Sequence, residues 1–128
     1  MANELILIVE DNEKNRKLVR DVLQFKGYRT LDAETGEAGV TLALEHKPDL
    51  VLMDYQLPGI DGIEAFQRIR SDAATAHIPI VAVTASAMPE EAARMKEAGF
   101  DGFQTKPINL KEFMQAVVDV LAKGRTAK

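Results

Sequence analysis

Polar residues that can bind a metal ion or a phosphoryl group follow four predicted strands of the sequence. They are Glu10 and Asp11 after residues 5–9, Asp54 after 50–53, Thr84 after 80–83, and Lys106 after 102–105. Carboxylate oxygens are the ligands that a hard cation such as Mg²⁺ prefers, and a lysine adds a fixed positive charge. These residue types favour phosphoryl transfer to a carboxylate, a reaction that asks the protein mainly for positioning and charge neutralisation.

Each of these residues also has an ordinary structural interpretation. Glu10 and Asp11 could simply begin a helix, because acidic side chains stabilise its positive end. Asp54 could be a turn residue before Pro58. The functional interpretation depends on all five residues lying at equivalent ends of predicted strands, where chance assembly is improbable.

Strand and helix patterns alternate along the chain. Continuous apolar runs at 5–9, 50–53 and 80–83 are typical of strands buried on both faces, and weaker runs at 28–31 and 102–105 predict edge strands. Helices are predicted from Glu13 to a stop at Gly27, after a cap at Thr35, from Gly62 towards Asp72, from Pro89, and along the apolar stripe of residues 110–121. This order predicts an α/β fold with a doubly wound parallel sheet and helices on both faces. Ligands of such folds bind beyond the carboxyl ends of the strands.

Bulk properties exclude several classes of protein. The 128 residues fit one domain, and 46% hydrophobic with 28% charged residues is an ordinary globular composition. The absence of cysteine excludes disulfides and thiolate metal sites. A net charge of −4 argues against direct nucleic-acid binding. No apolar stretch is long enough to span a bilayer, so we expect a cytoplasmic protein that does not enter the membrane.

Taken in order, these motifs resemble the response regulator receiver family of two-component systems. The resemblance covers the first strand with its acidic pair (residues 6–12), the phosphoacceptor strand and loop (52–62), the switch strand (78–85) and the Lys106–Pro107 pair. It extends from about residue 5 to 121. Asn12, residues 85–88 and Pro107–Ile108 are most similar to DivK-like single-domain receivers, although receivers within hybrid histidine kinases share them.

The resemblance implies a receiver domain over residues 1–122, a (βα)5 unit with the flavodoxin-like strand order 2-1-3-4-5, and a short flexible tail at 123–128. It implies that Asp54 accepts a phosphoryl group from a phosphohistidine of a kinase or phosphotransferase. Mg²⁺ would be bound by Asp54, by Asp11, by Glu10 directly or through water, and by the backbone carbonyl of Gln56. Thr84 would hydrogen-bond the phosphoryl group, Lys106 would pair with one of its oxygens, and the Phe103 ring would change rotamer as Thr84 moves.

The same resemblance implies a signalling switch that catalyses only its own phosphorylation and dephosphorylation. Its output would be a changed affinity for a downstream signalling protein, and the chain is expected to be a monomer. Two positions depart from common family members: position 10 is Glu where many have Asp, and position 103 is Phe where some have Tyr.

Three other functions remain as alternatives. A phosphatase of the haloacid dehalogenase type needs a second acid two residues after the nucleophile, where this chain has Gln56. An FMN-binding module needs a phosphate-cradling loop after the first strand, where Glu10 and Asp11 would repel phosphate. A receiver-like protein that is never phosphorylated would not need the intact acidic set and Lys106.

Overall fold

The fold is built on one sheet of five parallel strands. The computed structural model describes residues 4–54, 62–84, 89–105 and 110–123. The strands are β1 (Leu5–Val9), β2 (Arg29–Ala33), β3 (Leu50–Asp54), β4 (Ile80–Thr84) and β5 (Gly102–Thr105). They pair in the order β2-β1-β3-β4-β5, which confirms the predicted parallel sheet, its strand order and its two edge strands.

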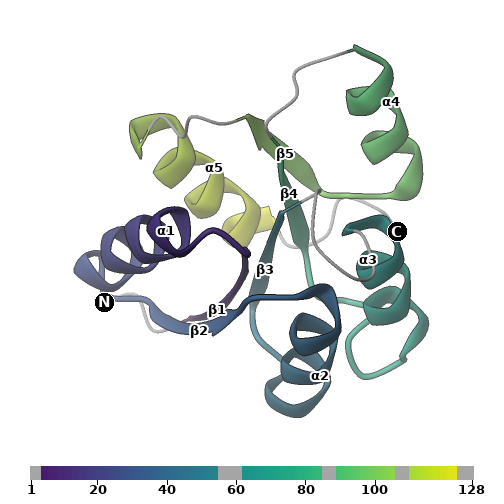
Figure 1. The fold of residues 1–128 in the computed structure, drawn as a ribbon, viewed down its shortest axis with the longest axis horizontal. Helices are drawn as coiled ribbons and strands as arrows, with labels where there is room; N and C mark the ends of the chain where they lie inside the picture. Colours follow the sequence, from purple (N-terminus) through teal and green to yellow (C-terminus); the bar gives the residue numbers. More distant parts are fainter. Residues whose placement is uncertain (1–3, 55–61, 85–88, 106–109, 124–128) are drawn as a thin grey trace.

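Helices cover both faces of the sheet, as the alternating pattern predicted. They are α1 (Glu13–Phe25), α2 (Gly36–His46), α3 (Gly62–Ser71), α4 (Pro89–Ala98) and α5 (Leu110–Lys123). Helices α1 and α5 lie on one side of the sheet, whereas α2 and α3 lie on the other and α4 stands beside β5 (Figure 1). Within the described residues, no helix has the length and apolar character needed to cross a membrane.

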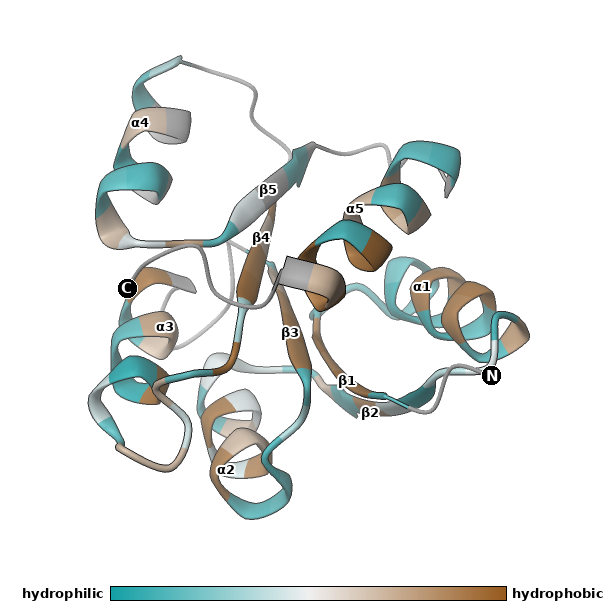
Figure 2. Cartoon of the chain, turned by 180° about the vertical axis from the view of Figure 1, so that it is seen from behind, coloured by the Kyte–Doolittle hydropathy of each residue, from teal (hydrophilic) through white to brown (hydrophobic). Residues whose placement is uncertain are grey.

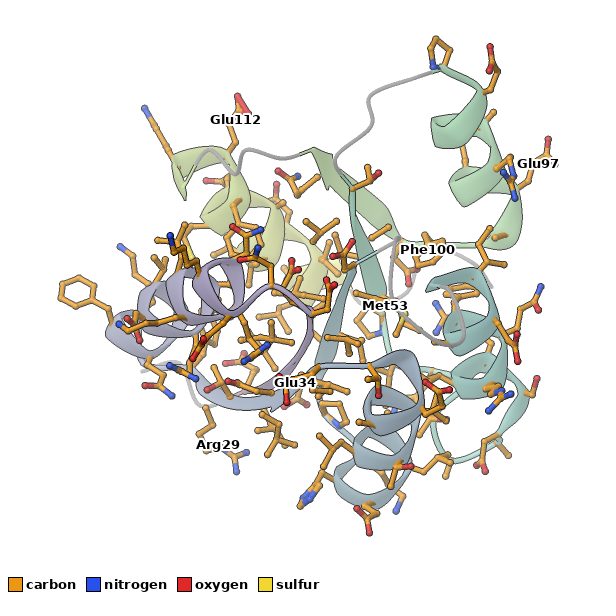
Figure 3. All side chains as sticks on the ribbon, viewed as in Figure 1. Arg29, Glu34, Met53, Glu97, Phe100 and Glu112 are labelled. Atoms are coloured by element: carbon orange, nitrogen blue, oxygen red, sulfur yellow. The ribbon has the colours of Figure 1, made fainter. Side chains whose placement is uncertain are left out.

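The core consists of two apolar clusters, one on each face of the sheet. Along β1, Leu7 and Val9 belong to the cluster on the α2–α3 side, whereas Ile6 and Ile8 belong to the cluster that contains Phe113. Successive strand residues point to opposite faces, so a strand covered on both sides must be apolar throughout. The central strands are accordingly brown in Figure 2, and Met53 and Phe100 lie in the interior in Figure 3 while Arg29, Glu97 and Glu112 point outward.

Capping residues set the first turns of α1 and α2. The Asn12 side chain accepts a hydrogen bond from the Asn15 amide at 3.0 Å, and the Thr35 hydroxyl accepts one from the Ala38 amide at 3.1 Å. These bonds satisfy amides that a helix leaves unpaired at its start. They confirm the predicted helix start at Glu13 and the predicted cap at Thr35.

Strand β2 lies further along the chain than predicted. We expected residues 28–31, but the strand runs from Arg29 to Ala33 and includes Asp32. The Asp32 carboxylate accepts a hydrogen bond from Arg20 Nη1 at 2.6 Å, so the negative charge within the strand is paired with an arginine of α1. The predicted domain limit at residue 122 stays a prediction, because α5 ends at Lys123 and residues 124–128 lie outside the described part of the chain.

Helix α2 approaches β1 closely at Gly39. A Cβ atom at this position would lie 2.7 Å from Val9 Cγ2 and 3.0 Å from Val9 Cγ1. Val9 is fully buried and β-branched, so its side chain has few alternative rotamers. The close packing of α2 on the end of β1 therefore requires glycine at position 39.

The described side chains of helix α4 bury less apolar surface than those of α5. Among its described side chains, Pro89, Glu90, Ala93, Arg94, Lys96 and Glu97 are exposed. Helix α5, in contrast, buries Phe113 and Val117 almost completely. Because weakly packed helices open more readily, we expect faster amide hydrogen exchange in α4 than in α5. Equal or slower exchange in α4, measured peptide by peptide, would contradict this expectation.

Candidate functional site

The ends of three neighbouring strands bring the predicted acidic residues and Thr84 to one edge of the sheet. Glu10 follows β1, Asp54 is the last residue of β3, and Thr84 is the last residue of β4. Val9 pairs with Met53, and Asp54 pairs with Val83, so the three strands end almost in step. The parallel register is therefore what assembles residues that are far apart in the sequence.

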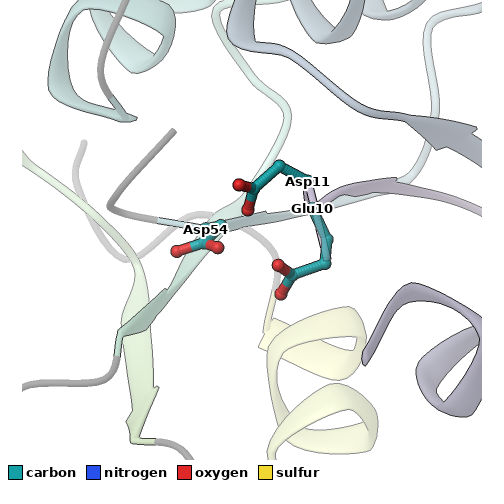
Figure 4. Close-up of side chains that lie close together, drawn as sticks. All are labelled: Glu10, Asp11 and Asp54. Atoms are coloured by element: carbon teal, nitrogen blue, oxygen red, sulfur yellow. The ribbon is translucent and has the colours of Figure 1, made fainter. Parts of the chain in front are cut away.

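Three carboxylates converge at this edge. Oxygen atoms of Glu10, Asp11 and Asp54 lie within 4.8 Å of one another (Figure 4). Glu10 is 5% exposed and Asp54 is 3% exposed, whereas Asp11 faces solvent. At an effective dielectric constant of about 20, two negative charges at such a separation repel by roughly 3 kcal/mol. A bound cation would relieve this repulsion.

The donor set fits a small divalent cation. All three side chains offer oxygen, which Mg²⁺ prefers, and Mg²⁺ commonly keeps several waters while binding few carboxylates. Asp11 is exposed, so water can reach the cluster from its side. Glu10, Asp11 and Asp54 are thus the described residues that could hold Mg²⁺.

The floor of the site is apolar. A cavity of about 10 Å³ beneath Glu10 and Asp54 is lined by apolar side chains of the sheet and of α1 and α5. The apolar lining residues are Ile8, Val9, Val19, Leu52, Val83 and Phe113. That space admits at most one water molecule, so no larger ligand reaches the carboxylates through it.

Backbone hydrogen bonds hold Glu10 on both sides. Its amide donates to the Ala33 carbonyl at 2.9 Å, and its carbonyl accepts from Arg16 Nη1 at 2.9 Å. Its side chain is held too, because Oε2 accepts from the Asn12 amide at 3.1 Å. The acidic residue at the end of β1 is therefore fixed by contacts to β2 and to the first turn of α1.

The other predicted site residues are only partly described. Thr84 is fully buried, and its backbone lies one residue beyond Val83, the partner of Asp54. The Phe103 backbone pairs with Ala82, but its side chain lies outside the described part of the chain, as do Gln56 and Lys106.

Sequence reasoning did not find Arg16. Its guanidinium reaches the Glu10 carbonyl and lies 3.9 Å from Asp32 and 3.7 Å from Glu34. An arginine in the first turns of an amphipathic helix looks like any solvated residue, and no spacing rule connects it to the end of β1. The contact becomes visible only in three dimensions.

Comparisons with known proteins agree on one family. The family model of the response regulator receiver domain matches residues 6–118. The polar-differentiation response regulator DivK of Brucella anthropi is 40% identical over 116 residues, which span 91% of this chain and 94% of the relative.

Solved structures give the same result. The receiver domain of a sensor histidine kinase from Pseudomonas aeruginosa PAO1, described with a magnesium ion coordinated in its active-site cleft, has a TM-score of 0.87 at 30% identity; the match covers 94% of this chain and 98% of that one. The chemotaxis response regulator CheY4 of Vibrio cholerae has a TM-score of 0.87 at 26% identity, with 91% and 98% covered.

Proposed function

The chain belongs to the response regulator receiver domain family, and on this premise we propose that it is a phosphoacceptor switch whose phosphoryl group is carried by Asp54. The donor would be a phosphohistidine of a histidine kinase or a histidine phosphotransferase in a two-component system or phosphorelay. The observation that carries the proposal is the convergence of Glu10, Asp11 and Asp54 within 4.8 Å at the carboxyl ends of β1 and β3. Asp54 is the member of this set that stands at the centre of the sheet edge, between β1 and β4.

The proposed transfer is a single displacement at phosphorus. A carboxylate oxygen of Asp54 forms a bond to phosphorus while the P–N bond to the donor imidazole breaks, and the imidazole takes up a proton. Mg²⁺, held by Glu10, Asp11 and Asp54, would offset negative charge on the phosphoryl oxygens.

Two further contributions rest on residues outside the described part of the chain. The Gln56 carbonyl would complete the metal ligands, and Lys106 would pair with a phosphoryl oxygen. We also retain the expectations that the protein acts in the cytoplasm, is a monomer, and catalyses only the phosphorylation and dephosphorylation of its own Asp54.

The test is phosphorylation by a small donor. Incubation of the chain with acetyl phosphate and Mg²⁺ should add the mass of one phosphoryl group, and chelation of divalent cations should prevent the addition. Intact-mass spectrometry measures both. No addition in the presence of Mg²⁺, or equal addition after chelation, would refute the proposal.

Asp11→Ala should weaken Mg²⁺ binding at least tenfold while the protein still folds. The variant loses a direct ligand, but Asp11 is exposed and its removal leaves no buried partner behind. In the absence of metal, it should be as stable as the parent or more so, since one of three repelling carboxylates is gone. Mg²⁺ titration by calorimetry and thermal unfolding measure the two effects, and an unchanged titration would remove Asp11 from the metal site.

The output would depend on Thr84. Phosphorylation should draw the Thr84 hydroxyl towards Asp54 and let the Phe103 ring turn inward, which changes the surface formed by α4, β5 and α5. Burial of the ring would favour the active arrangement by about 1–2 kcal/mol, enough to shift a two-state population several-fold without locking it. The phosphoryl donor would instead dock near Asn15 and Leu18 on α1, beside the acidic site.

Thr84→Ala should therefore accept phosphate and yet lose most of the difference in partner affinity between the two states. Affinity for the downstream partner, measured with and without phosphorylation, tests this. Retention of the full difference in the variant would show that Thr84 does not carry the signal.

A further inference from the structure

The guanidinium of Arg16 reaches the backbone between two of the clustered acids. Its Nη1 donates to the Glu10 carbonyl at 2.9 Å, and that carbonyl belongs to the peptide unit joining Glu10 to Asp11. The orientation of a peptide unit determines the directions in which the side chains on either side leave the backbone. Arg16 therefore acts on both acids without touching either carboxylate.

The guanidinium is itself held from the other side. Arg16 Nε lies 3.9 Å from Asp32, and Nη2 lies 3.7 Å from Glu34, a residue labelled in Figure 3 just after β2. The Arg16 side chain is 13% exposed and that of Asp32 is 24% exposed, so solvent screens their contact only in part; Glu34 is 74% exposed, and its contact with Arg16 is screened more strongly. One planar group thus connects the end of β1 to the end of β2, a geometry that arginine's fork of donors permits.

The fixed start of helix α1 places Arg16 within reach of the Glu10 carbonyl. Asn12 caps the helix, and the Arg16 amide donates to the Asn12 carbonyl at 2.9 Å, which makes it the first helical bond after the acidic pair. Arg16 thus lies one turn into a helix whose start is fixed directly beside Asp11. Its side chain folds back over that turn to reach Glu10.

We propose that Arg16 is a positioning residue of the acidic site: by holding the Glu10–Asp11 peptide, it keeps both carboxylates aimed at Asp54 and so raises the affinity for Mg²⁺. This inference rests on the proposed metal role of the cluster. Residues that orient metal ligands typically change metal affinity by about 10- to 100-fold when they are removed.

The test uses Arg20 as the matched control. Arg20 comes one turn later on α1 and also pairs with Asp32, at 2.6 Å, but its second ion pair is with Asp21, whereas Arg16 reaches the Glu10 carbonyl. Arg16→Gln and Arg20→Gln therefore each remove one positive charge and two ion pairs: both lose the pair with Asp32, and they lose in addition the pair with Glu34 or with Asp21, respectively. Only the first also releases the Glu10 carbonyl.

Calorimetric titration of the full chain with Mg²⁺ alone should show about a tenfold loss of affinity in Arg16→Gln and less than a twofold change in Arg20→Gln. Urea unfolding of the metal-free variants provides the readout for a merely structural role. Arg16→Gln that binds Mg²⁺ like the parent, or Arg20→Gln that loses as much affinity, would overturn the proposal.

Arg16→Lys keeps the test decisive if Arg16→Gln does not fold. Lysine retains the charge but cannot hold the Glu10 carbonyl and Asp32 together, so we expect about a threefold loss of affinity. Parent-like affinity of Arg16→Lys would show that charge alone suffices and that positioning is not the role. The parent and Asp11→Ala titrations separate the two proposals: if neither binds Mg²⁺, the proposed function fails, whereas a normal parent beside an unaffected Arg16 variant refutes only the role of Arg16.

Discussion

Asp54→Asn is expected to reduce phosphorylation by acetyl phosphate from one phosphoryl group per chain to none. The substitution keeps the size and shape of the side chain but removes the nucleophilic carboxylate. Asp54 is 3% exposed at the end of a central strand, and the isosteric change leaves its packing intact. The loss would therefore report chemistry and not unfolding, which circular dichroism can verify.

Asp119→Asn is the matched control for this experiment. Asp119 is exposed on α5, and an asparagine there keeps the oxygen that accepts from Gln115 Nε2 at 2.9 Å. This variant should be phosphorylated like the parent. If Asp54→Asn still gains the mass of a phosphoryl group, the acceptor is a different residue.

The second large effect concerns stability and lies far from the acidic site. Asp101, just before β5, is fully buried at its side chain and forms an ion pair with Arg70 Nη2 at 2.6 Å. It also accepts from the Ile80 amide at 2.8 Å, while Arg70 donates to the Ile78 carbonyl and stacks over the Phe66 ring at 4.9 Å. One carboxylate thus connects the end of α3 with the starts of β4 and β5.

Asp101→Ala should lower the free energy of unfolding by about 3–5 kcal/mol, because it leaves the Arg70 charge in a largely buried position. That loss is a large share of the 5–15 kcal/mol that typical domains possess. Asp101→Asn should lose less, since its side-chain oxygen can still accept from Ile80. Urea unfolding of the parent, Asp101→Ala and Asp101→Asn measures the three free energies of unfolding.

Glu64→Ala is the matched comparison for Asp101→Ala, because it removes an ion pair that is exposed. Glu64 pairs with Arg68 at the same 2.6 Å and on the same helix, but both side chains are about half exposed. Exposed pairs of this kind contribute only about 0.3–0.5 kcal/mol. If the two alanine variants lost similar stability, burial would not be what makes the Asp101 pair important.

The fold could be predicted because the local and global signals agree. Buried parallel strands are apolar throughout, so residues 5–9, 50–53 and 80–83 stand out, and Thr35 is a capping residue in a position where a helix begins. Strand β2 was misplaced because Asp32 looks like the end of a strand when its arginine partners on α1 cannot be seen. Tertiary pairing, and not local preference, extends that strand.

The acidic site could be predicted for a similar reason, since parallel strands end on the same edge of a sheet. Glu10, Asp11 and Asp54 do meet there, and Thr84 ends the neighbouring strand. The contacts that support the site and the fold could not be predicted from the sequence. Arg16 with Asp32, and Arg70 with Asp101, join residues whose separation in the chain follows no helical or strand period.

The contact between Gly39 and Val9 affects how mutational screens of this protein should be read. Any side chain at position 39 must displace Val9, and Val9 immediately precedes Glu10 in the chain. A saturation-mutagenesis screen scored on signalling would therefore rank position 39 with the acids, although α2 contributes none of the three carboxylates. A score of that kind cannot separate residues that perform the chemistry from residues that merely leave space for it. Measuring the abundance of folded protein as well as signalling makes the distinction. Substitutions at Gly39 should lower both quantities, whereas substitutions at Asp54 should lower signalling alone.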